Sequence, residues 1–465
     1  MATTPPAAWA DALADAIRNW FDGPVPAGAL ERARLQLLDS LACAAGAVDA
    51  EPVRAVRRAL APAGAPEATV LFGRERIAAL DAILVNGAAV RYLDANDVYL
   101  DAEGPGGHPS DNIVAALAVA ERSGCSGRDL LVAIAVAYEL TWRLRRDLLR
   151  PLPRGADWDA VTLSSIVCAA VGALLLGADR RTLAEALSIA AVRGFTLREI
   201  RGGEISALKA LGNALVAREG VLAALLATAG MSGPRLAFEG RRGLVRTLGG
   251  EPTPALLDAL RVDPVWAIDR ISVKAFPALG TAQAALHAAV RLHPVAAEEI
   301  AAVEIRLPDA RWTRTHGTIA ERHLPTSRES ADHSISYLVA MALLTGRVDL
   351  ADYERRAWLD PSVRRVIEAT TTVPDTALNA RATASFPAVV TVTRTDGTAA
   401  TAEMVAPPGS PGDPYDEERI AAKFARLDRT GTDRDAVVAA VRALADAPDV
   451  TALTATLTPT AVAAR

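Results

Sequence analysis

Long segments rich in alanine and leucine, with apolar side chains at helical spacing, dominate the first half of this 465-residue chain. The plainest case is 27–48, where one helical face carries Leu30, Ala33, Leu37, Leu38 and Leu41. We predict further helices at 9–21, 51–60, 77–90, 113–122, 127–146, 161–176, 182–193 and 205–228, with one short strand at 68–72. Because 51% of the residues are hydrophobic and only 4% aromatic, packed helices are favoured over a sheet-dominated fold. This part of the chain is predicted to be an all-α unit.

The pattern changes after Trp266. Segments typical of strands follow at 300–307, 388–394 and 401–405, with Asp396-Gly397 as a hairpin turn, and helices are predicted at 280–292, 334–344 and 361–368. From Pro407 a linker rich in proline and glycine leads back into helix. We therefore predict a mainly α protein with an α+β second domain. Residues 1–267, completed by 407–465, would form a large helical domain, and residues 268–406 a smaller α+β lid domain.

The stretch from Arg91 to Asn112, RYLDANDVYLDAEGPGGHPSDN, joins two of the apolar helices. It carries one of only six histidines, His108, together with Asp94, Asp97, Asp101, Glu103 and Asp111. A carboxylate and an imidazole that face one pocket can divide proton removal from proton donation. The alternative is that these side chains cap helices, with Ser110 or Asp111 at the next N-terminus, and line a solvated loop.

Lysine is rare in this sequence. Of fifty basic residues only three are lysine, namely Lys209, Lys274 and Lys423. Lysine offers a compact ammonium whose pKa shifts on burial, whereas arginine stays charged. Lys209 lies in the predicted helix 205–228, and Lys274 lies where the first domain gives way to the second. The two could together bind a substrate with several carboxylates in a cleft between the domains. The alternative is sequence drift.

Several partners and sites are not expected. The formal net charge is −5 and no block of basic residues occurs, which disfavours nucleic acid and electrostatic membrane contacts. No signal peptide or membrane span is predicted, so the expected location is cytoplasmic. Cys43, Cys125 and Cys168 are far apart and the glycine-rich segments lack a nucleotide-binding context, so no metal and no cofactor are expected. A small molecule is the expected partner.

Seven segments, taken in order, carry a family resemblance: ARLQLLDSLACAAGA, VNGAAVRYLDANDVYL, GHPSDNIVAALAVAE, LKALGNALVAREGVLAALLATAGMSGP, VKAFPALGT, HSISYLVAMALLTGRV and PGDPYDEERIAAKF. Through nearly its whole length the chain resembles the MmgE/PrpD superfamily, whose members include 2-methylcitrate dehydratase and cis-aconitate decarboxylase. The resemblance implies a metal-independent homodimeric enzyme with its active site between a helical domain and a lid. By matching positions it implies the catalytic residues Asp94, His108, Lys209, Lys274 and Tyr337. Arg91, Asp97 and Ser110 are the expected substrate contacts.

The chain also departs from the family pattern. Relatives often have threonine at the position of Val98 and histidine at those of Arg91 and Ala160, and they commonly place histidines at those of Leu279 and Gln283. A pocket that has lost polar groups would suit a less polar, alkylated substrate.

A lyase that dehydrates a citrate-like hydroxy polycarboxylic acid is the leading hypothesis. A base would take the proton beside a carboxylate, and the two lysines would neutralise negative charge. The alternatives are decarboxylation of a cis-aconitate-like acid, epimerisation of a dicarboxylate, and, in a different class, a homologue that binds its ligand without catalysis.

Overall fold

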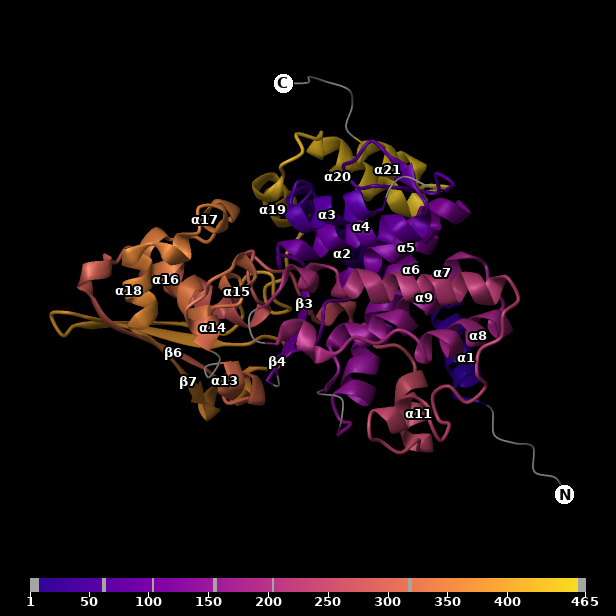
Figure 1. Cartoon of the computed structure of the whole chain (residues 1–465), viewed down its shortest axis with the longest axis horizontal. Coiled ribbons are helices and arrows are strands. Elements are labelled where there is room, and N and C mark those ends of the chain that lie inside the picture. Colours follow the sequence, from indigo (N-terminus) through magenta and orange to yellow (C-terminus); the bar gives the residue numbers. More distant parts are fainter. Residues whose placement is uncertain are drawn as a thin grey trace.

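The computed structural model describes residues 8–60, 64–102, 104–153, 157–202, 205–316 and 320–458, so that Glu103 lies outside it. The fold is mainly α with an additional α+β part, as the sequence predicts. In Figure 1 the helical part lies on the right and the α+β part, with strands β6 and β7, on the left. None of the helices in the described ranges is long and apolar enough to cross a bilayer.

The helical part is built around α7. Its helices are α1 (Trp9–Asp22), α2 (Ala27–Ala45), α3 (Glu51–Ala59), α4 (Ala79–Tyr92), α5 (Ile113–Ser123), α6 (Gly127–Arg143), α7 (Ser164–Leu175), α8 (Arg180–Ala191), α9 (Gly212–Thr228), α10 (Leu244–Thr247) and α11 (Pro254–Arg261). All 12 residues of α7 are buried, as expected of a helix that is apolar all round. Helices α5, α6, α8 and α9 pack against it. Gly220 of α9 lets the two backbones approach, because a Cβ there would collide with the Ser165 carbonyl oxygen.

The structure corrects three local predictions in this part. The helix predicted at 205–228 is broken, because a 3-10 turn, η6 (Ala207–Ala210), precedes α9 and carries Lys209. The strand predicted at 68–72 is only β1 (Ala68–Thr69), which pairs with β2 (Arg76–Ile77). Neither Ser110 nor Asp111 caps a helix. Instead the Ser110 hydroxyl donates to Asp97, because a buried carboxylate needs hydrogen-bond donors.

The prediction of an all-α first unit was also wrong at the boundary between the two parts. A small sheet with the order β4-β3-β5 joins β3 (Val98–Asp101) to β4 (Gly104–Pro105) and to β5 (Ile271–Ser272). Strand β5 ends directly before the segment of Lys274, and β3 begins directly after Asp97. This long-range pairing therefore brings the acidic stretch to the start of the α+β part.

The α+β part is a four-stranded sheet of order β7-β6-β8-β9 with helices packed on it. The strands predicted from the sequence are confirmed as β6 (Ile300–Pro308), β8 (Ala388–Arg394) and β9 (Ala399–Met404). Strand β7 (Thr370–Asp375), which pairs with β6 in parallel, was not predicted, because its TTTVPD sequence is polar and lies at the sheet edge. The helices are α12 (Gln283–Leu292), α13 (Arg311–His316), α14 (Ala320–His323), α15 (Arg328–Ala331), α16 (Ile335–Thr345), α17 (Leu350–Glu354) and α18 (Pro361–Glu368).

The C-terminal helices return to the helical part. They are α19 (Glu417–Leu427), α20 (Arg434–Ala443) and α21 (Thr451–Thr456), and Figure 1 shows them in yellow above α2 to α5. Helix α19 packs on α2, and Ile420 and Phe424 join the helical core. The last part of the chain thus lies beside helices from its beginning.

Candidate active site

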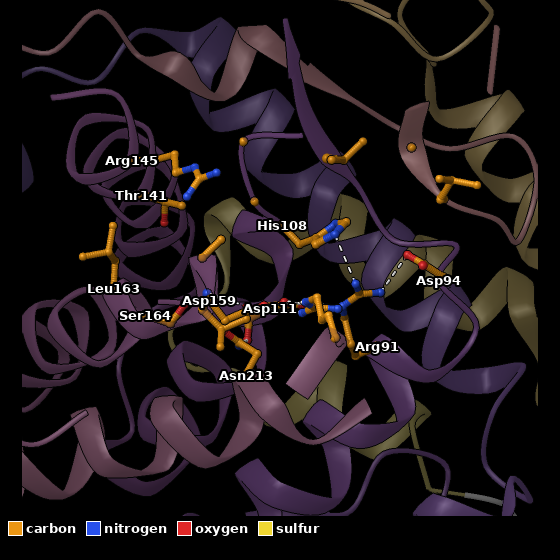
Figure 2. A pocket seen from close by; sticks show the side chains of 18 of the residues that line it. Arg91, Asp94, His108, Asp111, Thr141, Arg145, Asp159, Leu163, Ser164 and Asn213 are labelled. Carbon is orange, nitrogen blue, oxygen red and sulfur yellow. Dashed lines mark hydrogen bonds and ion pairs between the residues drawn. The ribbon is translucent and has the colours of Figure 1, made fainter. Parts of the chain in front are cut away.

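A cavity lies where the helical and the α+β parts meet, and it holds about 1170 Å³ of space, open solvent included. Its polar lining comes mainly from the helical part and includes Arg91, Asp94, His108, Asp111, Thr141, Arg145, Asp159, Ser164, Arg198, Arg201 and Asn213. The α+β part contributes Leu279, Gly280, Thr281, Arg322 and His333. Figure 2 shows Asp94, Arg91 and His108 on one side of this cavity and Arg145 and Thr141 on the other. Both parts of the chain are therefore needed to form it.

Asp94 is the best-connected acid of the cavity. Helix α4 ends at Tyr92, and Asp94 follows in a left-handed conformation with φ of 52°, which turns the chain sharply. Its carboxylate accepts hydrogen bonds from the Arg91 guanidinium at 2.7 Å, the Lys209 ammonium at 3.0 Å and the Lys274 ammonium at 2.5 Å. Burial raises the pKa of Asp94, but these three cations hold it well below its ordinary value. Asp94 is thus ionised at neutral pH.

Lys209 and Lys274 lie beneath Asp94 and are not exposed to the cavity. Their side chains are 3% and 0% exposed, respectively. Lys274 also donates to the Asp94 backbone carbonyl at 2.8 Å. Burial, opposed by Asp94, lowers the pKa of Lys274 to about 8. A proton on this ammonium is therefore exchangeable near neutral pH.

Lys209 occupies a place that would otherwise suit a metal ion. Among the described residues, Asp94, Asp332 and His333 form the one group of acidic or imidazole side chains close enough together to ligate a cation. The Lys209 ammonium lies 3.0 Å from Asp94 Oδ2, 3.1 Å from Asp332 Oδ1 and 3.2 Å from His333 Nδ1. A divalent ion at this position would have to displace the ammonium.

His333 presents one free ring nitrogen. Its Nδ1 lies 2.5 Å from Asp332 Oδ1, which places the proton of the neutral ring on Nδ1. Nε2 lies 3.5 Å from Asp94 Oδ2 and accepts no hydrogen bond from any residue of the described ranges. Burial and the Lys209 ammonium lower the pKa of His333 to about 4. The ring is therefore neutral and can accept a proton at Nε2.

His108 has both ring nitrogens engaged. Nδ1 lies 2.5 Å from the Asp97 carbonyl oxygen and donates to it, while Nε2 accepts from Arg91 Nη2 at 3.1 Å. Burial and the nearby Arg91 and Lys274 cations hold the pKa of His108 well below its ordinary value. Figure 2 shows Arg91 between His108 and Asp94, with an interaction to each. The structure thus links His108 and Asp94 through Arg91, so this carboxylate and imidazole line one cavity but do not bond each other directly.

Asp97 and Ser110 lie behind the cavity wall and do not line it. Asp97 accepts from the Ser110 hydroxyl and from the Tyr138 hydroxyl, each at 2.5 Å. Burial raises the pKa of Asp97 to about 7 although both hydroxyls oppose the shift. Asn96 donates to Ser110 and to Asp111 at 3.0 Å. These bonds fix the segment between Asp94 and strand β3, and the substrate contacts expected of Asp97 and Ser110 remain a prediction.

Tyr337 is not brought together with the other expected catalytic residues. It lies in α16, fully buried, and its ring packs edge-on against Tyr353 and Trp358. It does not line the cavity. Within the described ranges its hydroxyl has no hydrogen-bond partner.

Four of the positions at which the sequence departs from the family pattern line the cavity, namely Arg91 and the apolar Val98, Ala160 and Leu279. The three apolar side chains give part of the wall an apolar surface. Gln283 does not line the cavity. Its side-chain amide forms hydrogen bonds with the backbone of Ala275 and Phe276. It therefore braces the loop that carries Lys274.

The sequence did not single out the arginines of the cavity. Arg145, Arg198, Arg201 and Arg322 look like any other arginine in an arginine-rich chain. One signal is structural, since Arg145 lies in a π-helical turn, Leu144–Leu149, and such turns often occur at functional sites. His333 had a signal in the sequence, because it stands directly before the SISY segment of the resemblance.

The cavity carries more positive than negative charge. Five arginines and three aspartates line it, and the two lysines lie directly beneath Asp94. The chain as a whole has a formal net charge of −5, so this excess of cations is local. Such a cavity suits a small ligand with several negative charges.

Comparison with known proteins identifies relatives along most of the chain. The family model of the MmgE/PrpD N-terminal domain matches residues 11–257, and that of the MmgE/PrpD C-terminal domain matches residues 276–446. The 2-methylcitrate dehydratase of Cupriavidus necator is 32% identical over 336 residues, which cover 67% of each chain. The 2-methylcitrate dehydratase of Escherichia coli K12 is 27% identical over 416 residues, or 80% of this chain and 79% of the relative. The mitochondrial 2-methylcitrate dehydratase of Yarrowia lipolytica is 28% identical over 389 residues, or 78% and 71%.

The bonds of His108 predict that its ring stays neutral, with the proton on Nδ1, from about pH 8 down to about pH 5. Nitrogen-15 NMR of histidine-labelled protein should show this tautomer, with the resonance assigned by His108→Gln. The unfolded chain binds a proton on this ring below about pH 6.5 and the folded chain does not, so His108 should also lower the free energy of unfolding as the pH falls below that value. A doubly protonated ring at pH 6 would contradict the assignment.

Proposed function

Because the chain belongs to the MmgE/PrpD family, we propose that it is a hydro-lyase that eliminates water from a citrate-like hydroxy polycarboxylic acid. The excess of cations in the cavity carries this proposal, since an acid with two or three carboxylates needs several fixed positive charges. The relatives named 2-methylcitrate dehydratase support the reaction type. The cytoplasm remains the location expected from the sequence, although the relative from Yarrowia lipolytica is named mitochondrial.

The arginines are proposed to hold the carboxylates of the substrate. Arg201 pairs with Asp159, and Arg322 donates to the Arg201 backbone carbonyl at 2.8 Å. Arg322 therefore ties the α+β part to the helical wall beside Arg201. Guanidinium groups bind carboxylates through two parallel hydrogen bonds, which orients the acid as well as attracting it.

Elimination breaks a C–H and a C–O bond, forms a carbon–carbon double bond and releases water. We assign proton removal to His333, because its Nε2 is the free imidazole nitrogen at the cavity. Asp94 stays ionised and provides a fixed negative charge beside that nitrogen, which stabilises the ring once it is protonated. The protonated His333 ring then gives this proton to the leaving hydroxyl, which departs as water, and the ring becomes neutral again. Lys274 and Lys209 keep their protons and balance the charge of Asp94 during the reaction.

The apolar positions Val98, Ala160 and Leu279 favour a substrate with an alkyl substituent over unsubstituted citrate. No metal is proposed, because the Lys209 ammonium fills the place between Asp94, Asp332 and His333. Two reactions of the same site remain as alternatives, the decarboxylation of a cis-aconitate-like acid and the epimerisation of a dicarboxylate. A homologue that binds the acid without converting it is the alternative from another class.

A panel of acids tests this function. We expect citrate-type acids with an alkyl group at C2 to give a rise in ultraviolet absorbance, as the new double bond forms next to a carboxylate. The rate should be unchanged after exhaustive chelation. Carbon dioxide from an unsaturated tricarboxylate, without dehydration, would point to decarboxylation instead. Thermal stabilisation by the acids without turnover would identify a binding protein. Asp94→Asn serves as the inactive control, with kcat lower by about 100-fold or more.

His333→Gln tests the assignment of the base. Loss of a general base should lower kcat by about 10²- to 10⁴-fold, while KM changes little because the arginines remain. His293→Gln is the matched control, since His293 is exposed and does not line the cavity. If kcat of His333→Gln stays within about threefold of the unaltered enzyme, another group removes the proton.

We further propose a homodimer that covers the outer face of α9. Leu208 on η6, Leu215 on α9, and Leu197, which directly precedes a 3-10 turn (Arg198–Arg201) in contact with η6, are 50%, 42% and 62% exposed, respectively. Large apolar side chains that are exposed close together mark a surface for contact with another protein chain. Light scattering should give twice the 48.6 kDa mass of one chain, and Leu215→Glu should give one chain mass. Leu359→Glu, at another exposed leucine in the α+β part, should leave the dimer intact, and a monomeric unaltered protein would refute the dimer.

A further inference from the structure

The third lysine of the chain, Lys423, also reaches the segment of Asp94, from the C-terminal helices. It lies in α19 and its side chain is 2% exposed. Its ammonium donates to Asp39 Oδ1 of α2 at 2.5 Å and to the backbone carbonyl of Ala95 at 2.7 Å. All three lysines of the protein therefore bond either Asp94 or its neighbour.

Three side chains hold the carbonyl groups of this turn. Lys274 bonds the carbonyl of Asp94, Lys423 that of Ala95 and His108 that of Asp97. They come from the α+β part, the C-terminal segment and the helical part, respectively. Asp94 has a positive φ without being glycine, a conformation that persists only where its surroundings fix it. The bond to Ala95 is the one that the C-terminal segment supplies.

An ion pair is not needed to fasten α19. Ile420 and Phe424 already bury the apolar face of this helix against the helical core. A buried ion pair contributes little to stability beyond what apolar side chains of the same size would give. Asp39 Oδ2 has no hydrogen-bond partner within the described ranges, so the Asp39 carboxylate is paired through Lys423 alone. The pair therefore serves to place an ammonium under Ala95.

We propose that Lys423, held by Asp39, is a positioning residue for the dehydration, because it fixes the Asp94–Asp97 turn on which the cavity floor depends. Lys423 does not line the cavity and touches no substrate. It acts on Asp94, whose carboxylate must lie between Arg91, Lys209 and Lys274. The kinetic test of this inference rests on the proposed function, whereas the hydrogen-exchange test described below needs no substrate.

Lys423→Met keeps the length of the side chain and removes the ammonium. We expect kcat to fall by about 10- to 100-fold, since small displacements of catalytic groups have effects of this size, while KM stays within about threefold. Lys423→Met leaves the buried Asp39 carboxylate without a partner and could prevent folding. The double variant Asp39→Asn with Lys423→Met is therefore measured as well, and it tests the proposal even if the single variant does not fold. Replacing both residues removes the unpaired buried charge, but it should not restore kcat.

The pair Glu139 and Arg143 provides a matched control. It is also buried, with Arg143 Nε 2.6 Å from Glu139 Oε1, and Arg143 also holds backbone carbonyls, those of Ala259 and Asp263. It makes no bond to the Asp94–Asp97 turn. Glu139→Gln with Arg143→Met should therefore keep kcat. An equal loss of kcat in this control, or an unaltered kcat in the double variant at Lys423, would overturn the proposal.

Hydrogen exchange tests the same inference without any substrate. In the double variant at Lys423, amides in a peptide spanning residues 93–99 should exchange about tenfold faster, whereas the control pair should leave this peptide unchanged. If the unaltered protein converts none of the acids, the proposed function fails and this measurement alone decides the role of Lys423. Unchanged exchange in that peptide would show that Lys423 does not fix the turn.

Discussion

The carboxylate of Asp94 is surrounded by three cations, and the rest of the site depends on this arrangement. Arg91, Lys209 and Lys274 approach it within 3.0 Å in a place where almost no solvent reaches it. Burial alone would favour the neutral acid, and the cations reverse that preference. Each partner needs the others, because removing one member of such a cluster leaves a buried charge unpaired.

The same cluster joins distant parts of the chain. Asp94 and Lys209 belong to the helical part, whereas Lys274 and Asp332 belong to the α+β part. Strands β3 and β5 pair directly beside it, so a backbone ladder and a network of charges hold the two parts together at one point. A cavity formed there is lined from both sides, and its shape is sensitive to how the two parts are placed.

The cavity combines two kinds of wall with different consequences for a ligand. The arginines provide fixed positive charge for carboxylates, while Val98, Ala160 and Leu279 provide apolar surface. Between them lie two imidazoles with different bonding. His108 is locked between a carbonyl and Arg91, and His333 keeps one nitrogen open. This difference between the two rings follows from their hydrogen bonds and not from the residue type.

The sequence by itself determined the helical character and the strands β6, β8 and β9, and it singled out Asp94, Lys209 and Lys274 as candidates, because periodicity and rarity are local properties of the chain. The family follows from it as well, and the limits of the domains remain a prediction. Only the tertiary structure decided which arginines line the cavity, that Arg91 separates His108 from Asp94, and that Tyr337 lies apart in α16. Lys423 and Ala95 are 328 positions apart, and no pattern along the chain reveals such a bond. Contacts of this kind depend on how whole helices pack, which the identity of one residue and its neighbours does not specify.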